Sequence, residues 1–365
     1  MKWTVWRLLP AVLAAGAVLS LIPGCSVGYL ATQGYYQGKL LSGGIDVEDA
    51  LAREDVSAAT KDQLRLIQEI RRYGEETLGM TPTRNYTRVN LEWREQIFNV
   101  SGSRELKFEP FMWWFPIVGS VPYKGYFQKP DAEAEAERLK QQGYEVAVRR
   151  VAGYSTLGWF RDPILPSMLD DDLAEISNLI LHELAHSTLF IPGKIDFNES
   201  FASFVADVAS LRFIAFKEGA EGTWRQEAQA RQNDAKRVTT FMHTLYTDLD
   251  LLYKSDRSDS DKRREKAAIL ARAAEAYEGL PFESQRYRGR KFPKLNNADL
   301  LQYKRYSSAE DQFARVLAGQ EDELKRFFEV FRAVGKSGED PFKALERLSN
   351  EASSTSPQER TSTQP

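Results

Sequence analysis

The stretch Leu179–His186 reads L-I-L-H-E-L-A-H and contains two of the three histidines of the chain. His182 and His186 are four residues apart, so on an α-helix both imidazoles leave the same face, with Glu183 beside them. In this H-E-x-x-H pattern, two histidines bind Zn²⁺ and the glutamate acts as a general base. The pattern requires a helix with one buried side, and it restricts the fold more than any other feature.

The surrounding residues favour such a helix. Asp170–Asp172 supplies acids suited to a helix N-terminus. Apolar residues then recur at helical spacing, at Leu173, Ile176, Leu179, Ile180 and Leu184. A helix whose histidines are only core or surface residues is the alternative, and this context favours the metal-binding interpretation.

A catalytic zinc site needs a third protein ligand, and Glu199 is the candidate. The segment Ile191–Gly193 breaks the chain and lets it reverse, and Asn198 is a plausible N-cap of a second helix. Glu199 would then face the first helix from the first turn of the second. Its alternative role is that of an ordinary first-turn acid.

Asp207 and the third histidine are further candidates. Asp207, two turns after Glu199, would accept a hydrogen bond that orients a ligating histidine, and Ser203 competes for that place. The third histidine, His243, is either a transition-state donor or a structural residue on a long helix.

Several motifs add a resemblance to a known family. They are Trp114–Gly119, Pro122–Phe127, Ala152–Trp159, Asp162–Pro163 and Leu295–Ala298. From about Cys25 to about Val334 the chain resembles the bacterial putative aminopeptidase family of membrane-anchored lipoproteins, and its zinc motifs resemble the glutamate-type zincin metallopeptidases. The resemblance implies a predominantly helical α+β fold. In it, a small mixed sheet flanks the H-E-x-x-H helix of a zincin-like core, with helical elaborations at both ends.

The N-terminus reads as a targeting segment. Lys2 and Arg7 precede a mostly apolar run that ends at the only cysteine, Cys25. The sequence predicts a signal peptide over 1–24 and lipid attachment at Cys25, with an uncleaved anchor as the alternative. The expected location is a bacterial cell envelope, where the lipid anchor favours the outer membrane, facing the periplasm, with the inner membrane as the alternative.

The organisation follows from composition. Residues 25–47 read as a lipidated tether that begins to pack around Tyr29–Tyr36, 48–220 as the catalytic core with N-terminal helices, 221–348 as a helical domain completing the cleft, and 349–365 as a disordered tail.

Within these ranges we expect strands and helices as follows. Strands are expected near 87–93, 96–100 and 144–152, with a turn at 101–103. Helices are expected at 131–140, 224–252 and 261–277.

The stretch before the zinc helix suggests a substrate-binding edge. Within Tyr144–Phe160, an edge strand would border the cleft and accept a peptide through backbone hydrogen bonds, with 151–159 as that strand or the loop that follows it. Tyr154 is our candidate to stabilise the oxyanion, and packing at a strand end is its alternative. Asp162 is a candidate contact for a substrate amine. By resemblance, Asn296 and Asn297 would line the cleft.

Charge excludes one class of partner. The chain has 49 Lys and Arg against 52 Asp and Glu, and removal of the leader makes it more acidic, so nucleic acid is not an expected ligand. We expect a lipid-anchored zinc metallopeptidase acting on peptides, with aminopeptidase activity favoured over endopeptidase activity. The rivals are a zinc-containing scaffold or peptide-binding chaperone without catalysis, and a helical lipoprotein without metal.

Overall fold

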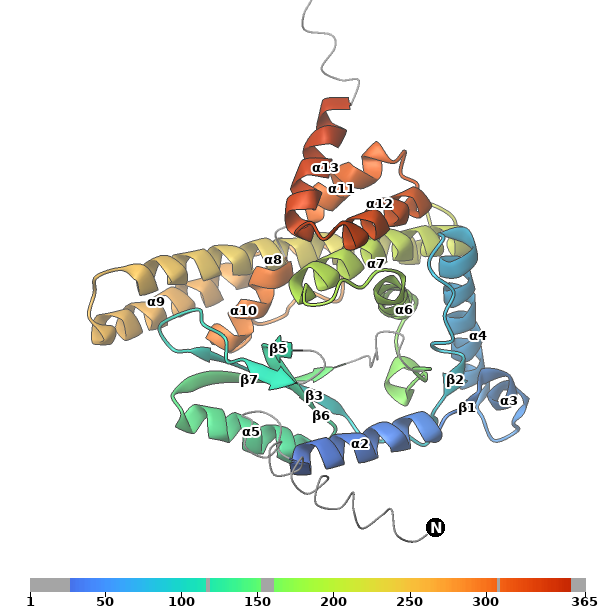
Figure 1. Ribbon diagram of the computed structural model, residues 1–365, viewed down its shortest axis with the longest axis horizontal. Helices are drawn as coiled ribbons and strands as arrows, with labels where there is room; N and C mark the ends of the chain where they lie inside the picture. Colours follow the sequence, from blue (N-terminus) through green and yellow to red (C-terminus); the bar gives the residue numbers. More distant parts are fainter. Residues whose placement is uncertain (1–26, 116–118, 152–160, 307–308, 356–365) are drawn as a thin grey trace, which may run out of the picture.

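The periodic segments of the sequence form helices around a short sheet (Figure 1). The computed structural model describes residues 27–115, 119–151, 161–306 and 309–355. The α-helices are α2 (Val27–Ser42), α3 (Val47–Ala52), α4 (Ala58–Arg72), α5 (Lys129–Gln141), α6 (Leu173–Thr188), α7 (Ile195–Glu218), α8 (Thr223–Lys254), α9 (Asp259–Glu278), α10 (Asn297–Tyr306), α11 (Glu310–Gly319), α12 (Leu324–Ser337) and α13 (Pro341–Thr355). A π-helical turn, Tyr73–Thr77, follows α4, and a 3-10 turn, Pro166–Met168, precedes α6.

The strands are short and pair antiparallel. They are β1 (Ile45–Asp46), β2 (Arg88–Val89), β3 (Ile97–Arg104), β4 (Trp113–Phe115), β5 (Gly119–Val121), β6 (Tyr123–Tyr126) and β7 (Tyr144–Val151). The largest sheet has the order β6-β3-β7, and two-stranded pairs join β1 to β2 and β4 to β5. The predominantly helical α+β class is thus confirmed. The sheet was expected to be mixed, but β3 lies between β6 and β7, so both of its pairings are antiparallel.

Helix α6 begins where the acids predicted. The Asp172 carboxylate accepts hydrogen bonds from the backbone N–H groups of Ala174 and Glu175, which caps the first turn. Its apolar face is buried, including Ile180 and Leu184. This face belongs to one core with the buried residues of α4, which are Leu64, Ile67 and Ile70.

A cluster of phenylalanines joins α7 to the C-terminal helices. Phe197 and Phe201 of α7 contact rings of α11 and α12, and Phe331 lies 5.9 Å from Phe197 and 5.5 Å from Phe201 between ring centroids. Phe313 and Phe327 complete the cluster, and all five side chains are fully buried. Figure 1 shows α11, α12 and α13 stacked on the side of α7 away from the sheet. Burial of this aromatic surface fixes α7 in place.

A second core lies between α8, α9 and α10, and polar side chains join these helices to the sheet. Lys266 of α9 donates to Glu145 of β7 at 2.7 Å, and the backbone N–H of Asn297 donates to the same carboxylate at 2.8 Å. The Asn297 side chain donates to the backbone carbonyls of Arg104 and Glu105 and accepts a hydrogen bond from Tyr253. The expected helices at 131–140, 224–252 and 261–277 are α5, α8 and α9.

Three local expectations were wrong. Residues 27–42, expected as part of a tether, form the helix α2. The expected packing around Tyr29 and Tyr36 is present, with Tyr29 on Tyr126 and Tyr36 on Phe127, and it holds the helix against the rest of the protein. Residues 101–103 are not a turn but part of β3, where a Cβ at Gly102 would lie 3.3 Å from Leu139.

The third concerns the C-terminal tail. Residues 349–355 continue α13, with Ser349 buried and bonded to Arg315 at 2.7 Å. The remainder of the expected tail, and the leader with Cys25, lie outside the described residues. In the described ranges, every helix is too short or too polar to cross a bilayer.

Candidate metal centre

The two histidines of the H-E-x-x-H pattern meet on one face of α6. Their Nε2 atoms are 3.1 Å apart, and the rings are almost perpendicular, with an interplanar angle of 84°. His186 is 5% exposed and His182 is 20% exposed. The helix therefore presents two imidazole nitrogens at one point, one of them inside the protein and one at its margin.

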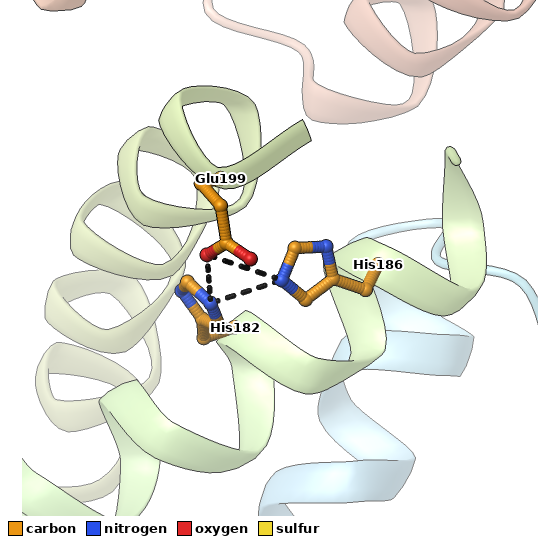
Figure 2. A group of neighbouring side chains, drawn as sticks. All are labelled: His182, His186 and Glu199. Atoms are coloured by element: carbon orange, nitrogen blue, oxygen red, sulfur yellow. Dashed lines mark hydrogen bonds and ion pairs between the residues drawn. The ribbon is translucent and has the colours of Figure 1, made fainter. Parts of the chain in front are cut away.

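Glu199 completes the group from α7 (Figure 2). Its Oε2 lies 3.6 Å from Nε2 of His182 and 3.7 Å from Nε2 of His186. Ligands of a tetrahedral zinc at 2.0–2.1 Å are separated by about 3.3 Å, so the three contacts match the edges of such a site. Two imidazole nitrogens and one carboxylate oxygen are also the donor set of known catalytic zinc sites.

The chain reversal before α7 holds Glu199 in this position. Gly193 has a φ of 73° in the turn between α6 and α7. Asn198 was expected to cap the second helix, but α7 begins at Ile195. Asn198 is buried inside α7, where its side chain exchanges two hydrogen bonds of 2.9 Å with the backbone of Ile191. It fixes the loop onto the helix and leaves the next residue, Glu199, facing α6.

Neighbouring charges shift the pKa values of Glu199 and His182 in opposite directions. Burial raises the pKa of Glu199, but the two imidazoles outweigh it, and the net pKa is well below its usual range. Burial also lowers the pKa of His182, and the carboxylates of Glu199 and Glu183 outweigh it, so the net pKa is raised. The carboxylates thus favour positive charge at this point, as expected of a cation site.

Two buried polar atoms beside this group have no partner among the described residues. They are Oε2 of Glu183 and Nδ1 of His186. Buried polar atoms are almost always bonded, so such exceptions mark sites completed by water, an ion or a ligand. The donor set, the ligand separations and the unpartnered Oε2 of Glu183 together fit a divalent metal.

A cavity of about 580 Å³ adjoins the centre. His182, Glu183 and Asn178 line it from α6, Asp207 and Ser210 from α7, and Arg231 and Gln232 from α8. Arg286 and Tyr287 line it from the loop after α9, and Val151 from the end of β7. β7 is an edge strand of its sheet, as the sequence suggested for the strand that borders the cleft. The candidate metal centre is therefore open to a space large enough for part of a peptide.

Asp207 lies in this cavity near His182. Asn178 donates a hydrogen bond of 2.8 Å to its Oδ1. Burial raises the pKa of Asp207 to about 6, with the Glu310 carboxylate acting in the same direction and Asn178 and His182 opposing it. Its carboxylate is bonded to Asn178, and its role in orienting a histidine stays a prediction.

Other sequence candidates lie elsewhere. His243 is exposed on α8, beside Tyr246, and does not line the cavity. Asn296 and Asn297 fasten α10 to the sheet, with Asn296 donating to the Val146 carbonyl at 3.0 Å. Asp162 is fully buried. Tyr154 lies outside the described residues.

The sequence interpretation missed several cavity residues. Asn178 stands four residues before His182, so helical spacing alone places it on the same face, and this signal was available. Arg231 comes from a segment that only the tertiary structure brings to α6.

Comparison with known proteins agrees with the resemblance seen in the motifs. The family model described as "Putative aminopeptidase" matches residues 28–344, which include α6, α7 and every residue of the metal centre. No curated protein and no solved structure matched the chain. On the strength of this match over most of its length, the chain belongs to the putative aminopeptidase family.

Proposed function

We propose that this protein is a zinc metallopeptidase. The observation that carries the proposal is the convergence of His182, His186 and Glu199 on one point, beside Glu183 and open to a cavity. Membership of the putative aminopeptidase family supports peptide as the substrate. The same combination supports a zincin-like core of the glutamate-ligand type, with α6 and α7 as its two metal-binding helices.

Each residue has a distinct role in this proposal. His182, His186 and Glu199 would hold Zn²⁺, which supplies a water of lowered pKa and polarises the scissile carbonyl. Glu183 would accept a proton from the attacking water and return it to the leaving amine. Its Oε2 is buried and free of competing partners among the described residues, as a group that must exchange a proton with substrate requires.

Two proposals rest on sequence motifs. Tyr154 would donate a hydrogen bond to the oxyanion of the tetrahedral intermediate. Its support is its position just after β7, whose last residue, Val151, lines the cavity. Cys25 would carry the lipid that anchors the protein to the outer membrane of a bacterial envelope, facing the periplasm. The support is the apolar segment that ends at this only cysteine.

The test of the catalytic role is Glu183→Gln. The variant keeps the size and one hydrogen-bonding oxygen of Glu183 and leaves the three zinc ligands intact. We expect full zinc content by elemental analysis and a fall in peptide hydrolysis of about 10²–10⁴-fold, the usual contribution of a general base. Glu329→Gln, an exposed position on α12, is the matched control and should retain activity.

The outcomes separate the rival functions. Full hydrolysis by Glu183→Gln would remove Glu183 from the mechanism. A wild-type protein that holds zinc and binds peptides without cutting any of them would be the non-catalytic scaffold or chaperone. A protein without zinc would be a helical lipoprotein. Comparison of free and N-acetylated peptides distinguishes an aminopeptidase, which needs the free amine, from an endopeptidase.

A further inference from the structure

The cavity follows one face of α6 away from the metal centre. Asp171, Glu175, Asn178 and His182 line it and are spaced by four, three and four residues, which is the spacing of one helical stripe. Asp171 lies just before the helix and the others lie within it. A substrate bound at His182 therefore has a path along α6 toward the start of that helix.

Both arginines that line the cavity are already paired with acids. Arg231 contacts Asp172 at 2.8 Å and Glu227 at 2.9 Å. Arg286 forms an ion pair with Glu175. Because both guanidinium groups have carboxylate partners, the lining offers little to attract a negatively charged group.

Asp171 differs from its neighbours. Asp172 caps α6, so Asp171 is not needed there. Within the described part of the chain its carboxylate has no ion-pair or hydrogen-bond partner, although it lines the cavity and is partly buried. Burial raises its pKa and the charge of Asp172 adds to this, with Arg286 only partly opposing it. A desolvated carboxylate without a partner is unfavourable in the free protein and would be stabilised by a cation.

The opposite wall is held rigidly. Asp234 of α8 is fully buried, and its carboxylate accepts hydrogen bonds from the backbone N–H groups of Glu283 and Ser284 and from the Ser284 hydroxyl. These bonds fix the start of the loop that carries Arg286 and Tyr287. The acidic end of the cavity is therefore formed by a fixed loop facing a helix.

We propose that this end of the cavity, between Asp171 and Glu175 on one side and the Arg286 loop on the other, binds a cationic group of the peptide substrate. The inference rests on the proposed peptidase function and adds a substrate class to it. An ammonium or guanidinium would pair with Asp171 and share Glu175 with Arg286. The group is either a free N-terminal amine or the side chain of a lysine or arginine.

Helix geometry sets the position of that group. At 1.5 Å per residue, Glu175 lies about 10 Å and Asp171 about 16 Å along the α6 axis from His182. An extended peptide advances about 3.3 Å per residue, so the cation belongs roughly three to five residues from the cleaved bond. A dipeptide is too short to reach it.

The test is a set of zinc-loaded full-length proteins and a set of peptides. The peptides carry lysine or glutamine at each successive position, with a free or acetylated N-terminus. In wild type, one position three to five residues from the cut should favour the cation in kcat/KM by about tenfold or more, the effect of one hydrogen bond to a charged group. Lysine dependence with either terminus identifies a side chain. Dependence on a free terminus that lies three to five residues from the cut, and that Asp171→Asn abolishes, identifies the N-terminal amine.

Variants assign the effect to Asp171. Asp171→Asn should remove most of the preference, and Asp170→Asn, an exposed neighbour, should keep it. Melting temperature confirms that both variants fold. Hydrolysis by wild type without any charge preference, or an equal preference in Asp171→Asn, would overturn the cation site and leave the peptidase intact.

A binding measurement keeps the two proposals separate. Fluorescence anisotropy of the same peptides on zinc-loaded Glu183→Gln reads the preference without catalysis. If wild type hydrolyses nothing, the peptidase fails, and the anisotropy still decides whether Asp171 selects a cation.

Discussion

At the scale of single residues, the candidate centre depends on where three donor atoms point. Spacing on α6 fixes His182 and His186, but Glu199 reaches them only because Asn198 holds the chain reversal. Glu199 is the fifth residue of α7, beyond the first turn where an acid would only cap the helix. Its 3.6 and 3.7 Å contacts to the two imidazoles make it a candidate ligand.

Asp207 gives a prediction about pH and stability in the metal-free protein. Its pKa is raised to about 6 in the folded state, so between about pH 4 and 6 the native protein holds a proton that the unfolded chain has released. Stability therefore falls as pH rises through this window, and above it the charged carboxylate remains unfavourable. Asp207→Asn should be more stable than wild type at pH 7.5 by about 1–3 kcal/mol.

The measurement is urea unfolding with a chelator present, at pH 7.5 and about pH 4. The difference between the two proteins should nearly vanish at the lower pH, where Asp207 is protonated in the folded state and about half protonated in the unfolded chain. A variant that is less stable at pH 7.5 would show that the carboxylate stabilises the fold.

At the scale of elements, the contact of α6 with the π-helical turn after α4 depends on a glycine. A Cβ on Gly74 would lie 3.0 Å from Leu181, 3.1 Å from the Met80 sulfur and 3.2 Å from Leu184. Leu181 and Leu184 belong to the turns that carry His182 and Glu183. The close approach of the two elements thus supports the turns of α6 that carry the candidate metal centre.

Gly74→Ala should destabilise the fold by about 1–3 kcal/mol through overpacking. Gly34→Ala is the matched control, because Gly34 lies in α2 and a Cβ added there would have no neighbouring heavy atom within 4 Å among the described residues. At this position, alanine should stabilise by up to about 1 kcal/mol through helix propensity. The free energy of unfolding of both variants is measured by chemical denaturation. Equal changes in the two would show that the π-helical turn and α6 have room for an added methyl group between them.

At the scale of the whole molecule, one hydrophobic core includes residues from both sides of the domain boundary that the sequence suggested at residue 220. It contains Leu40 near the N-terminus, Phe201 of α7 and Leu345 of α13. The proposed catalytic core and the C-terminal helices therefore share buried surface. Although they follow one another along the chain, they do not have separate cores. Folding of α7, and with it the position of Glu199, depends on helices more than a hundred residues later.

Phe331→Ala tests this coupling. Phe331 is fully buried against Phe197 and Phe201, so its loss should lower stability by about 3–5 kcal/mol. It should also weaken zinc binding, because α7 carries Glu199. Phe216→Ala is the control in α7 itself; its ring is 66% exposed, and its effect should be below about 1 kcal/mol. Unfolding curves and zinc titrations provide both readouts, and unchanged zinc affinity in Phe331→Ala would refute the coupling.

The features that depend on local spacing could be predicted from the amino-acid order. The start of α6 at the Asp172 cap, the shared face of His182 and His186, and the extents of α5, α8 and α9 all follow from helical periodicity and capping, which act within a few residues. Where a distant contact overrides local preference, the sequence alone was insufficient. Examples are α2, which aromatic packing holds, and Gly102, which lies inside a strand.

Only the folded structure shows which side chains from distant parts of the chain share the cavity. Asp171 and Arg286 are more than a hundred residues apart, and periodicity contains no information on their separation in space. The distance between them in space is set by burial of the common core, because nonpolar surface from α4, α7 and α12 must be removed from water together. The candidate ligands could be predicted from local spacing and the chain reversal between them, and the chemical character of the surrounding cavity could not.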